Sequence, residues 1–391
     1  MNKKNAVYFQ SGGPTSVINS SFYGVIKEVY KHKNKISKLF ISKYGVKGLI
    51  KNDLLEINKP LKEYKDLLRK NGAACGSARL LLKENDQNFL SIIETINKNN
   101  IGYVFVNGGN DSMDTANKLI KYFKNNNIDC KVVGIPKSVD NDLCITDHVP
   151  GYPSTCKYIY EVTKGVYQDV NSYDEPRINI IEVLCRDSGW LVAATGLASL
   201  CDMGPDLIYL PEVSFDTKQF LKDVKKLYEE KGNIIIGVAE SLKDKQGKFV
   251  APVIEKDVFG HEYFGSIGEY LCNLIKEKYG YRTRRLSLGI IERDMALLNS
   301  KVDTKEAIMC GSNAVKYALN GIEGMVVMKR ISNNPYKIKF EICDFDKVAN
   351  DVKFFPTKWI NKTKNNITKE YIEYAKPFVD LEETKVRKDI L

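Results

Sequence analysis

The sequence predicts an α/β fold in which mostly parallel sheets are covered by helices. Short runs of β-branched and aromatic residues alternate along the chain with longer stretches of helical periodicity. The residues that follow these apolar runs are rich in glycine, acidic residues and arginine. Alternation of this kind is typical of parallel strands joined by helices, and ligands of such sheets bind beyond the carboxyl ends of the strands. We therefore look for the chemistry of this chain at its strand ends.

The predicted strands and helices form six successive pairs. They are residues 6–10 with 17–30, 103–107 with 114–123, 130–136 with 154–167, 178–184 with 190–200, 234–239 with 268–280, and 286–291 with 305–319. From Asn333 onward the chain is rich in lysine and asparagine and its periodicity is weak, so we expect an irregular or helical extension there.

Length and composition limit the class of protein. A chain of 391 residues with 43% hydrophobic content favours about two domains. It has no apolar window near the roughly 18 residues that a membrane helix needs, and MNKKNAVYFQSGG lacks the apolar core of a secretory signal, so we expect a cytoplasmic protein. The nine cysteines are scattered without a CxxC pair and the three histidines are isolated, which indicates reduced thiols and no zinc site.

The chain is basic, with a net charge of +10. Its lysines are spread along the sequence as on solvated helix faces, whereas a nucleic-acid-binding protein would concentrate them in a patch interleaved with aromatic residues. The pattern argues against nucleic-acid and membrane partners. An anionic small substrate explains the excess of positive charge more simply.

Two glycine-rich loops follow predicted strands. SGGPTS contains Gly12 and Gly13 and opens a helix, and NGGNDS occupies the same place after a later strand. Glycines allow backbone N–H groups to approach a phosphate, and the amino end of a helix favours its charge. A tight turn is the alternative interpretation of either loop. Asp111 is unexpected in an anion-binding loop and requires a separate explanation.

The segment PKSVDND places Lys137, Asp140 and Asp142 directly after an apolar run. One carboxylate can act as a general base for a hydroxyl group, the second can support the geometry or a metal, and the lysine can neutralise phosphate charge. A solvated acidic turn is the alternative. Together with arginines at other strand ends, the residues suit phosphoryl transfer between anionic partners.

Several motifs together resemble the phosphofructokinase family. In order they are SGGPTSVIN, GSAR, GGNDS, GIPKSVDNDL, EVLCRDSGW, GVAES and RLSLGIIER. Their order and approximate spacing match the family over nearly the whole chain to about Leu319. The loops GGNDS and PKSVDND are similar to those of the pyrophosphate-dependent branch, whereas ATP-dependent members typically have GGDGS and GTIDND.

The resemblance implies how the donor is held and selected. Gly12, Gly13 and Arg79 would bind the diphosphate. Asp111 would fill the space of an α-phosphate and repel a third phosphate. Lys137 would stabilise the phosphate that leaves pyrophosphate.

The resemblance also implies the catalytic residues and the metal. Asp140 matches the base that removes the proton from the sugar's 1-hydroxyl, Asp142 supports this geometry, and Arg186 would straddle the transferred group with Asp140. Asn110 stands where an aspartate commonly helps to bind Mg²⁺, and its amide oxygen can accept a coordinated water. Mg²⁺ is therefore the expected cofactor.

The expected sugar site contains residues from several strand ends. They are Ser138, Val139, Asp140, Arg177, Leu184, Cys185, Arg186, Glu240, Tyr281, Arg284 and Arg293. Arg177 matches a residue that the family often contributes across a subunit interface, so a homodimer or homotetramer is expected. Residues 1–140, completed by a segment near 295–330, would form the donor domain. Residues 141–294 would form the fructose 6-phosphate domain, and residues 331–391 a C-terminal extension.

Three positions depart from the family pattern. Cys185 replaces a glycine, and Ile290 and Glu292 replace the usual His or Tyr and Gln. A carboxylate at position 292 would disfavour a nearby phosphate unless it turns away or pairs with Arg293.

The reaction that the resemblance implies is reversible, Mg²⁺-dependent transfer of a phosphoryl group from pyrophosphate to fructose 6-phosphate in glycolysis. An ATP-dependent enzyme of the same fold and a catalytically weakened sugar-phosphate-binding paralogue are the alternatives.

Overall fold

The structure is a computed structural model that describes residues 3–83, 87–251, 253–256, 262–348 and 351–381. The chain divides into two compact units, each assembled from two separate segments. Unit 1 contains Met1–Ser154 and Arg293–Lys353, and unit 2 contains Thr155–Glu292 and Phe354–Leu391. Among the described residues, no helix is both long enough and apolar enough to span a membrane.

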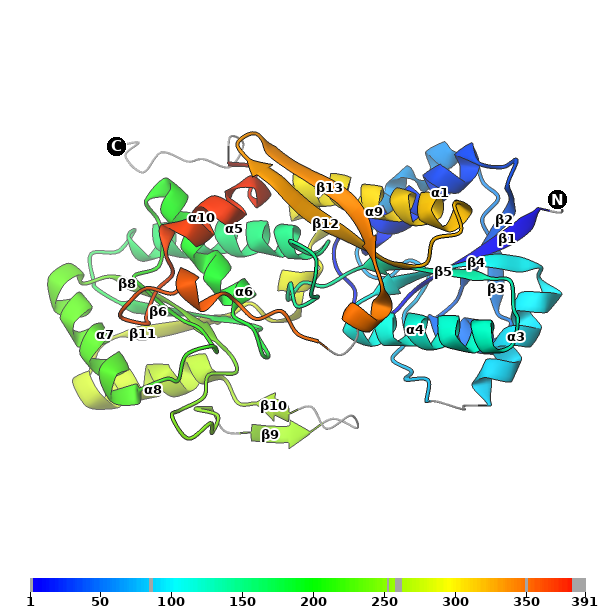
Figure 1. The fold of residues 1–391 in the computed structure, drawn as a ribbon. Helices are drawn as coiled ribbons and strands as arrows, with labels where there is room; N and C mark the ends of the chain where they lie inside the picture. Colours follow the sequence, from blue (N-terminus) through cyan, green and yellow to red (C-terminus); the bar gives the residue numbers. More distant parts are fainter. Residues whose placement is uncertain (1–2, 84–86, 252, 257–261, 349–350, 382–391) are drawn as a thin grey trace. The chain divides into compact units, whose positions relative to one another are not determined.

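Unit 1 is built on a seven-stranded sheet with the strand order β13-β12-β5-β4-β1-β2-β3 (Figure 1). Neighbouring strands are parallel except at the two edges, where β3 and β13 run antiparallel to β2 and β12. The strands are β1 (Lys4–Gln10), β2 (Ile36–Ser42), β3 (Leu54–Glu56), β4 (Ile101–Gly108), β5 (Lys131–Pro136), β12 (Gly324–Asn333) and β13 (Tyr336–Cys343).

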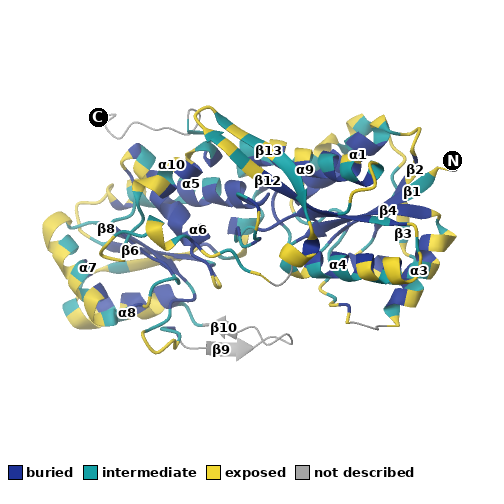
Figure 2. Cartoon of the chain, in the orientation of Figure 1, coloured by how far each residue is buried: buried dark blue, intermediate teal, exposed yellow. Residues whose placement is uncertain are grey.

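Helices cover both faces of this sheet because its central strands are apolar on both sides. They are α1 (Ile18–Lys31), α2 (Val46–Lys51), α3 (Asn88–Lys98), α4 (Asn110–Asn125) and α9 (Lys301–Leu319). Val7 and Phe9 of β1 pack into one core with α2, α3 and α4, and Ala6 and Tyr8 pack into a second core with α1 and α9. Alternate side chains of a strand point to opposite faces, which explains why β1 contributes to both cores. Figure 2 shows the buried strands between helices with exposed outer faces.

Unit 2 contains a four-stranded parallel sheet in the order β11-β6-β8-β7 and a two-stranded antiparallel ribbon. The strands are β6 (Ile178–Val183), β7 (Leu207–Tyr209), β8 (Ile234–Ala239), β9 (Val253–Lys256), β10 (Glu262–Phe264) and β11 (Thr283–Ser287). The helices are α5 (Tyr152–Val170, from Thr155 onward in this unit), α6 (Trp190–Ala193), α7 (Thr217–Lys231), α8 (Ile267–Tyr279) and α10 (Lys369–Ala375).

The C-terminal segment of unit 2 packs through aromatic side chains. Trp190 at the start of α6 lies edge-on to Phe355 and Trp359, with ring centroids 5.2 and 5.8 Å away. Tyr371 and Tyr374 of α10 complete this cluster. Such contacts stabilise a core beyond the area they bury, so Phe355, Trp359, Tyr371 and Tyr374 are part of the core of unit 2.

The predicted fold class is confirmed, since both large sheets are mostly or wholly parallel and are surrounded by helices. Two local expectations were wrong. The apolar run at residues 286–291 was expected to be a strand, but only its first two residues belong to β11 (Thr283–Ser287). A 3₁₀ helix follows at Gly289–Arg293. Residues Tyr336–Cys343 form a strand rather than an irregular or helical extension. That strand lies at a sheet edge and alternates lysines with apolar residues, which weakens the apolar signal.

Candidate active site

Three predicted loops lie at one edge of the sheet in unit 1. Strands β1, β4 and β5 are neighbours, with Gln10 opposite Asn107 and Gly108 opposite Pro136. The loops that follow are joined by backbone hydrogen bonds. The Ser11 N–H donates to the Asn107 carbonyl at 2.9 Å. The Lys137 N–H donates to the Gly108 carbonyl at 3.0 Å. The two glycine loops and PKSVDND therefore form one continuous surface.

Lys137 joins the first glycine loop to the catalytic segment. Its Nζ donates to the Gly13 carbonyl at 2.6 Å. Gly12 has a φ of +76°, and a Cβ atom at that position would lie 3.3 Å from the Lys137 Nζ. Both the left-handed backbone and the close approach favour glycine there. The loop thus presents its backbone and one ammonium group at the same place.

Burial changes the acidity of this ammonium group. Lys137 is 6% exposed. Burial lowers the pKa of Lys137 to about 8; Asp142 and Asp140 oppose the decrease, while Arg293 and Arg79 contribute to it. A lysine among two carboxylates and two guanidinium groups suits an anion with several negative charges, because an added phosphate would favour the charged ammonium.

Ser138 orders the two carboxylates of the catalytic segment. Its hydroxyl donates to Asp142 Oδ1 at 2.5 Å and accepts the Asp140 N–H at 3.1 Å. Both aspartates are half-buried. Asp142 is thereby held by a neutral donor, and the backbone of Asp140 is fixed beside it.

The second glycine loop leads directly into α4. Asn110 is the first residue of this helix and Asp111, which is exposed, is the second. The side-chain amide of Asn110 donates to the Asp351 carbonyl at 2.8 Å, which identifies the nitrogen end of the amide. A carboxylate in the first helical turn is favoured by the helix dipole, so Asp111 also has a structural reason to be there.

The donor atoms at this edge are suitable for Mg²⁺. They are oxygens of Asn110, Asp111, Asp140 and Asp142. Mg²⁺ is commonly bound by one or two carboxylates, water and substrate phosphates rather than by an all-protein cage. Within the described ranges, no group of three or more His, Cys, Asp or Glu side chains could hold a metal alone. A magnesium ion at this edge would need water or phosphate oxygens in addition to these side chains.

Two arginines approach the same loops. Arg79 is exposed on a segment that Ser77 ties to the first glycine loop, through a 2.6 Å hydrogen bond to the Gly12 carbonyl. Arg293 belongs to unit 1, and its Nη1 would lie 3.5 Å from a Cβ atom at Gly13. Its Nε is buried without a hydrogen-bond partner among the described residues. The structure thus places Arg293 with the donor loops, whereas most of the other expected sugar ligands are in unit 2.

Part of the expected sugar set lies at the carboxyl end of the sheet in unit 2. Strands β6 and β8 are parallel neighbours, with Val183 opposite Ala239. Leu184, Cys185 and Arg186 follow β6 directly, and Glu240 follows β8. Parallel pairing therefore brings these two loops to one edge, where Arg186 is exposed.

Three other expected sugar ligands lie toward the opposite end of that sheet. Arg177 immediately precedes β6, Tyr281 precedes β11, and Arg284 is the second residue of β11, beside Asn179. At roughly 3.3 Å per residue, the length of β6 separates them from the carboxyl-end loops by about 20 Å. The sheet therefore keeps the two groups of one chain too far apart to hold the same sugar phosphate.

The contacts of these amino-end residues lie within unit 2. Arg177 stacks on the Tyr173 ring, with its guanidinium carbon 3.9 Å from the ring centroid. Arg284 pairs with Asp169 at 3.3 Å on the exposed surface. Tyr281 stacks on Tyr228 at a centroid distance of 3.9 Å. Arg284 is exposed on unit 2, whereas Arg177 is half-buried.

The positions that depart from the family pattern have different surroundings. Glu292 is 2% exposed, and its carboxylate accepts the Leu184 N–H at 3.4 Å. Its charge is therefore directed to the main chain of the loop after β6. Cys185 is buried in that loop, whereas Ile290 is 63% exposed.

Sequence patterns missed one segment of the site in unit 1. The Asp351 carbonyl contacts Asn110, and Lys353 contacts the loop after Asp140. These residues lie more than two hundred positions from the motifs. They act partly through backbone atoms, so their side-chain pattern carries no signal of the contact.

Comparisons with known proteins agree with this architecture. The family model described as Phosphofructokinase matches residues 5–318. The pyrophosphate–fructose 6-phosphate 1-phosphotransferase of Xanthomonas campestris pv. campestris is 33% identical over 388 residues, covering 97% of this chain and 92% of that protein. The enzyme of the same name from Methylococcus capsulatus is 34% identical and covers 98% and 93%.

A solved structure extends the similarity to three dimensions. The pyrophosphate-dependent phosphofructokinase of Nitrosospira multiformis aligns with a TM-score of 0.89 at 32% identity, covering 99% of this chain and 95% of that one. The sequence match includes every motif loop of unit 1 before residue 319 and the strand ends of unit 2. On the agreement of sequence, fold and strand-end residues, the chain belongs to the phosphofructokinase family.

Proposed function

We propose that this protein transfers a phosphoryl group reversibly between pyrophosphate and the 1-hydroxyl of fructose 6-phosphate. The products are fructose 1,6-bisphosphate and phosphate. Full-length relatives that carry this activity in their names support the proposal. The observation that carries it is Lys137, whose buried ammonium group lies against Gly13 in a segment shared with two carboxylates.

The donor would lie over the glycine loops of unit 1. Gly12 and Gly13 allow backbone N–H groups to approach its phosphates, and Arg79 supplies positive charge from the neighbouring segment. Asp111 is exposed at the start of α4, where a third phosphate would meet its negative charge. We infer that the site accepts two phosphates and disfavours a nucleoside triphosphate.

The chemical step would use the segment after β5. Asp140 takes the proton from the sugar's 1-hydroxyl as that oxygen forms its bond to phosphorus. The bridging P–O bond of pyrophosphate breaks, and the released phosphate carries away the bonding electrons. Lys137 stabilises the negative charge that develops on this leaving group. Asp142 and Ser138 hold Asp140 in position, and Arg186 would contact the transferred group.

Magnesium is the cofactor that we infer. Asn110 would bind it through a coordinated water, and the phosphate oxygens would supply further ligands. When bound, Mg²⁺ neutralises phosphate charge and thereby favours the approach of the sugar oxygen.

The sugar phosphate would be held by two copies of the chain. Leu184, Arg186 and Glu240 would come from one chain, and Arg177 and Arg284 from its partner, since unit 2 places the two sets about 20 Å apart. The expected sugar set also includes Ser138, Val139 and Arg293, which belong to unit 1. The active form is then at least a homodimer. We place its reaction in cytoplasmic glycolysis.

A single assay tests the reaction and separates its rivals. Formation of fructose 1,6-bisphosphate is measured with fructose 6-phosphate and Mg²⁺ plus pyrophosphate, ATP or neither. Turnover that depends on pyrophosphate is expected. Turnover with ATP alone would identify an ATP-dependent enzyme, and binding of fructose 6-phosphate without turnover from either donor would identify a weakened paralogue.

A further inference from the structure

A short segment near the end of unit 1 connects the two loops that carry the proposed metal ligand and base. The Asp351 carbonyl accepts the amide of Asn110 at 2.8 Å. Two residues later, the Lys353 N–H donates to the Asp142 carbonyl at 2.8 Å. The segment therefore touches the start of α4 and the segment after β5 at the same time.

The side chain of Lys353 makes three further contacts to the catalytic loop. Its Nζ donates to Asn141 Oδ1 at 3.1 Å, to the Thr146 carbonyl at 3.1 Å and to the Asp147 carbonyl at 2.9 Å. An ammonium group has three N–H donors, and the loop supplies an oxygen for each. Lys353 is thus a cross-link between residue 141 and residues 146–147.

The loop has a backbone that needs such a constraint. Asn141 has a φ of +54° and Ile145 a φ of +68°. The left-handed region is tolerated by asparagine but is strained for a β-branched residue such as isoleucine. Strained residues persist only where the surroundings fix them. Asn141 separates Asp140 from Asp142, so a change in its backbone would turn both carboxylates.

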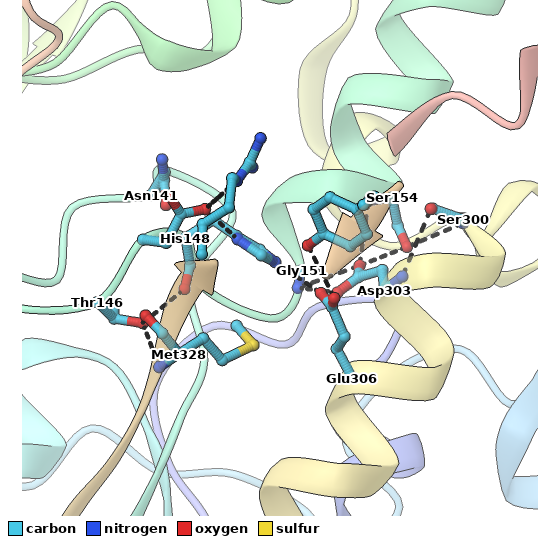
Figure 3. A network of polar contacts seen from close by, with 12 residues as sticks. Asn141, Thr146, His148, Gly151, Ser154, Ser300, Asp303, Glu306 and Met328 are labelled. Atoms are coloured by element: carbon cyan, nitrogen blue, oxygen red, sulfur yellow. Dashed lines mark hydrogen bonds and ion pairs between the residues drawn. The ribbon is translucent and has the colours of Figure 1, made fainter. Parts of the chain in front are cut away.

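Neighbouring charges leave the Lys353 ammonium group directed to the loop oxygens. The Asp147 carboxylate accepts from the His148 ring at 2.8 Å and from Arg330 Nε at 3.1 Å. Asn141 is fully buried. Figure 3 shows Asn141, Thr146 and His148 on this loop. The side-chain carboxylate of Asp147 is thus bound by other cations, while its carbonyl binds Lys353.

We propose that Lys353 is a positioning residue for phosphoryl transfer, which acts through Asn141 to hold Asp140 and Asp142 in their working orientation. The inference rests on the proposed function, because it assumes that Asp140 is the base. Nothing in the argument requires Lys353 to contact either substrate. Its loss should therefore lower turnover far more than substrate affinity.

The test compares kcat and the KM values for pyrophosphate and fructose 6-phosphate in the full chain. Lys353→Met, which removes the ammonium group but keeps most of the side-chain length, should lower kcat by about 10- to 100-fold, as small misplacements of catalytic groups do. Both KM values should stay within about twofold. Lys157→Met is the matched control, because Lys157 is also largely buried but pairs with Asp380 in unit 2, at 2.8 Å.

Two further variants separate positioning from general stability. Asn141→Gly removes the side-chain contact but allows the left-handed backbone. Lys353→Met should therefore lower kcat by a smaller factor in the Asn141→Gly background than in the wild type. Lys353→Ala should regain turnover when ethylammonium is added, whereas ethanol should have no effect. These readouts would not change if the lysine only stabilised the fold.

Several results would overturn the proposal. A folded Lys353→Met chain with kcat within about twofold of wild type would do so, as would fully additive effects with Asn141→Gly. If Lys353→Met unfolds while Asn141→Gly has wild-type turnover, the lysine serves stability alone. A wild-type chain without pyrophosphate-dependent turnover would instead count against the proposed function, so the two failures can be told apart.

Discussion

Lys137 is a buried cation whose charged form is disfavoured by burial and would be favoured by a bound anion. Its ammonium group is buried against the Gly13 carbonyl, and burial lowers its pKa to about 8. A bound phosphate would supply the negative charge that the buried group otherwise lacks. Binding and charging of the lysine therefore support each other.

This coupling predicts an alkaline limit to activity. Because the pKa of Lys137 is lowered, the ammonium form is present below about pH 8 and is lost as the pH rises through that value. We expect kcat/KM for pyrophosphate to fall above about pH 8. The alkaline decrease in kcat should begin at a higher pH, because the bound donor favours the charged form of Lys137.

The effect of a second lysine on this pH profile must be distinguished from that of Lys137. Burial also lowers the pKa of Lys353 to about 8. Lys353→Arg keeps a positive charge across the whole pH range. A decrease in kcat/KM above about pH 8 that persists in this variant is therefore due to Lys137. A kcat/KM profile that stays flat to about pH 10 would contradict the role of Lys137.

Residues of the site could be predicted where they follow a strong strand. Lys137 and Asp140 come directly after the apolar run of β5, and Gly12 directly after that of β1, so their positions follow from the strands alone. Lys353 follows no strand and contacts the loop through oxygens of the main chain and of one asparagine. Arg293 follows a predicted strand, yet packs in unit 1 because the chain returns to that unit there.

At the level of elements, a buried polar network connects the loop after β5 to α9 and to the β12–β13 hairpin (Figure 3). His148 lies between Asp147 and Glu306, at 2.8 and 2.6 Å. Tyr336 in β13 donates to Glu306 at 2.8 Å, and Arg330 in β12 contacts Asp147. The hairpin thereby supports the loop that carries the proposed base.

A neighbouring network fixes the start of α5. The fully buried Asp303 in α9 accepts the Gly151 N–H and the N–H and hydroxyl of Ser154, at 2.5–3.2 Å. Burial raises the pKa of Asp303 to about 6, and the hydrogen bonds oppose the increase. Buried polar groups that are bonded in this way specify one arrangement of the loop between β5 and α5.

The network around His148 predicts a pH-dependent stability. Burial alone lowers the pKa of His148, but Glu306 and Asp147 outweigh it and raise the pKa to about 9, above the usual 6.5. The stabilisation is therefore fully present below about pH 6.5 and is lost as the pH rises through about 9. We expect the Tm to fall over this range.

The matched comparison uses the other histidine of unit 1 that pairs with a glutamate. His148→Gln should lower the Tm at pH 7 and flatten its dependence on pH, because breaking a buried ion pair typically costs about 3–5 kcal/mol. His32→Gln should do neither, since the His32 side chain is 32% exposed. A His148→Gln chain with an unchanged Tm at pH 7 would contradict the network's role.

Element prediction succeeded where strands are buried on both sides. The runs of β1, β4, β5, β6 and β8 are mostly apolar and were located to within two residues at each end. Strands β2, β3, β12 and β13 were not located: β3 is three residues long and β13 places lysines on its outer face, whereas β2 and β12 lie inside the sheet. Position at the edge of a sheet is set by pairing with distant residues, which the local sequence does not contain.

At the level of the whole molecule, the separation of charged groups in unit 2 bears on assembly. Arg177 and Arg284 lie at the opposite end of the sheet from Arg186 and Glu240. A partner chain that docks the amino end of one sheet near the carboxyl end of the other would complete two sites at once. Two-fold symmetric contacts give such reciprocal exchange.

Active sites formed from two different variant chains would reveal whether the subunits share site residues. Asp140→Asn should lower turnover by about 10²-fold or more, as loss of a general base does, and Arg177→Ala should impair sugar binding. When the two inactive chains are mixed and allowed to exchange subunits, one site of each hybrid keeps both wild-type residues, so partial activity should return. No recovery after verified exchange would argue against a shared site.

Donor choice combines the residue, element and whole-molecule levels. Asp111 is the second residue of α4, which follows β4, and Lys137 follows β5; both strands belong to the sheet of unit 1. Lys137→Gly should lower pyrophosphate-dependent turnover by roughly 10²- to 10³-fold, as loss of one electrostatic donor does. Asp111→Gly should tighten ATP binding more than it raises ATP turnover, because it only removes a like charge and opens space.

The most direct test is therefore kcat/KM for pyrophosphate and for ATP in the wild type, Asp111→Gly, Lys137→Gly and the double variant. Asp114→Gly, one turn into the same helix and paired with Lys118 at 2.7 Å, controls for weakening of α4. We predict a wild type that prefers pyrophosphate, a selective loss in Lys137→Gly and ATP binding gained only with Asp111→Gly. A wild type that prefers ATP, or a folded Asp111→Gly chain with unchanged ATP binding, would contradict the account.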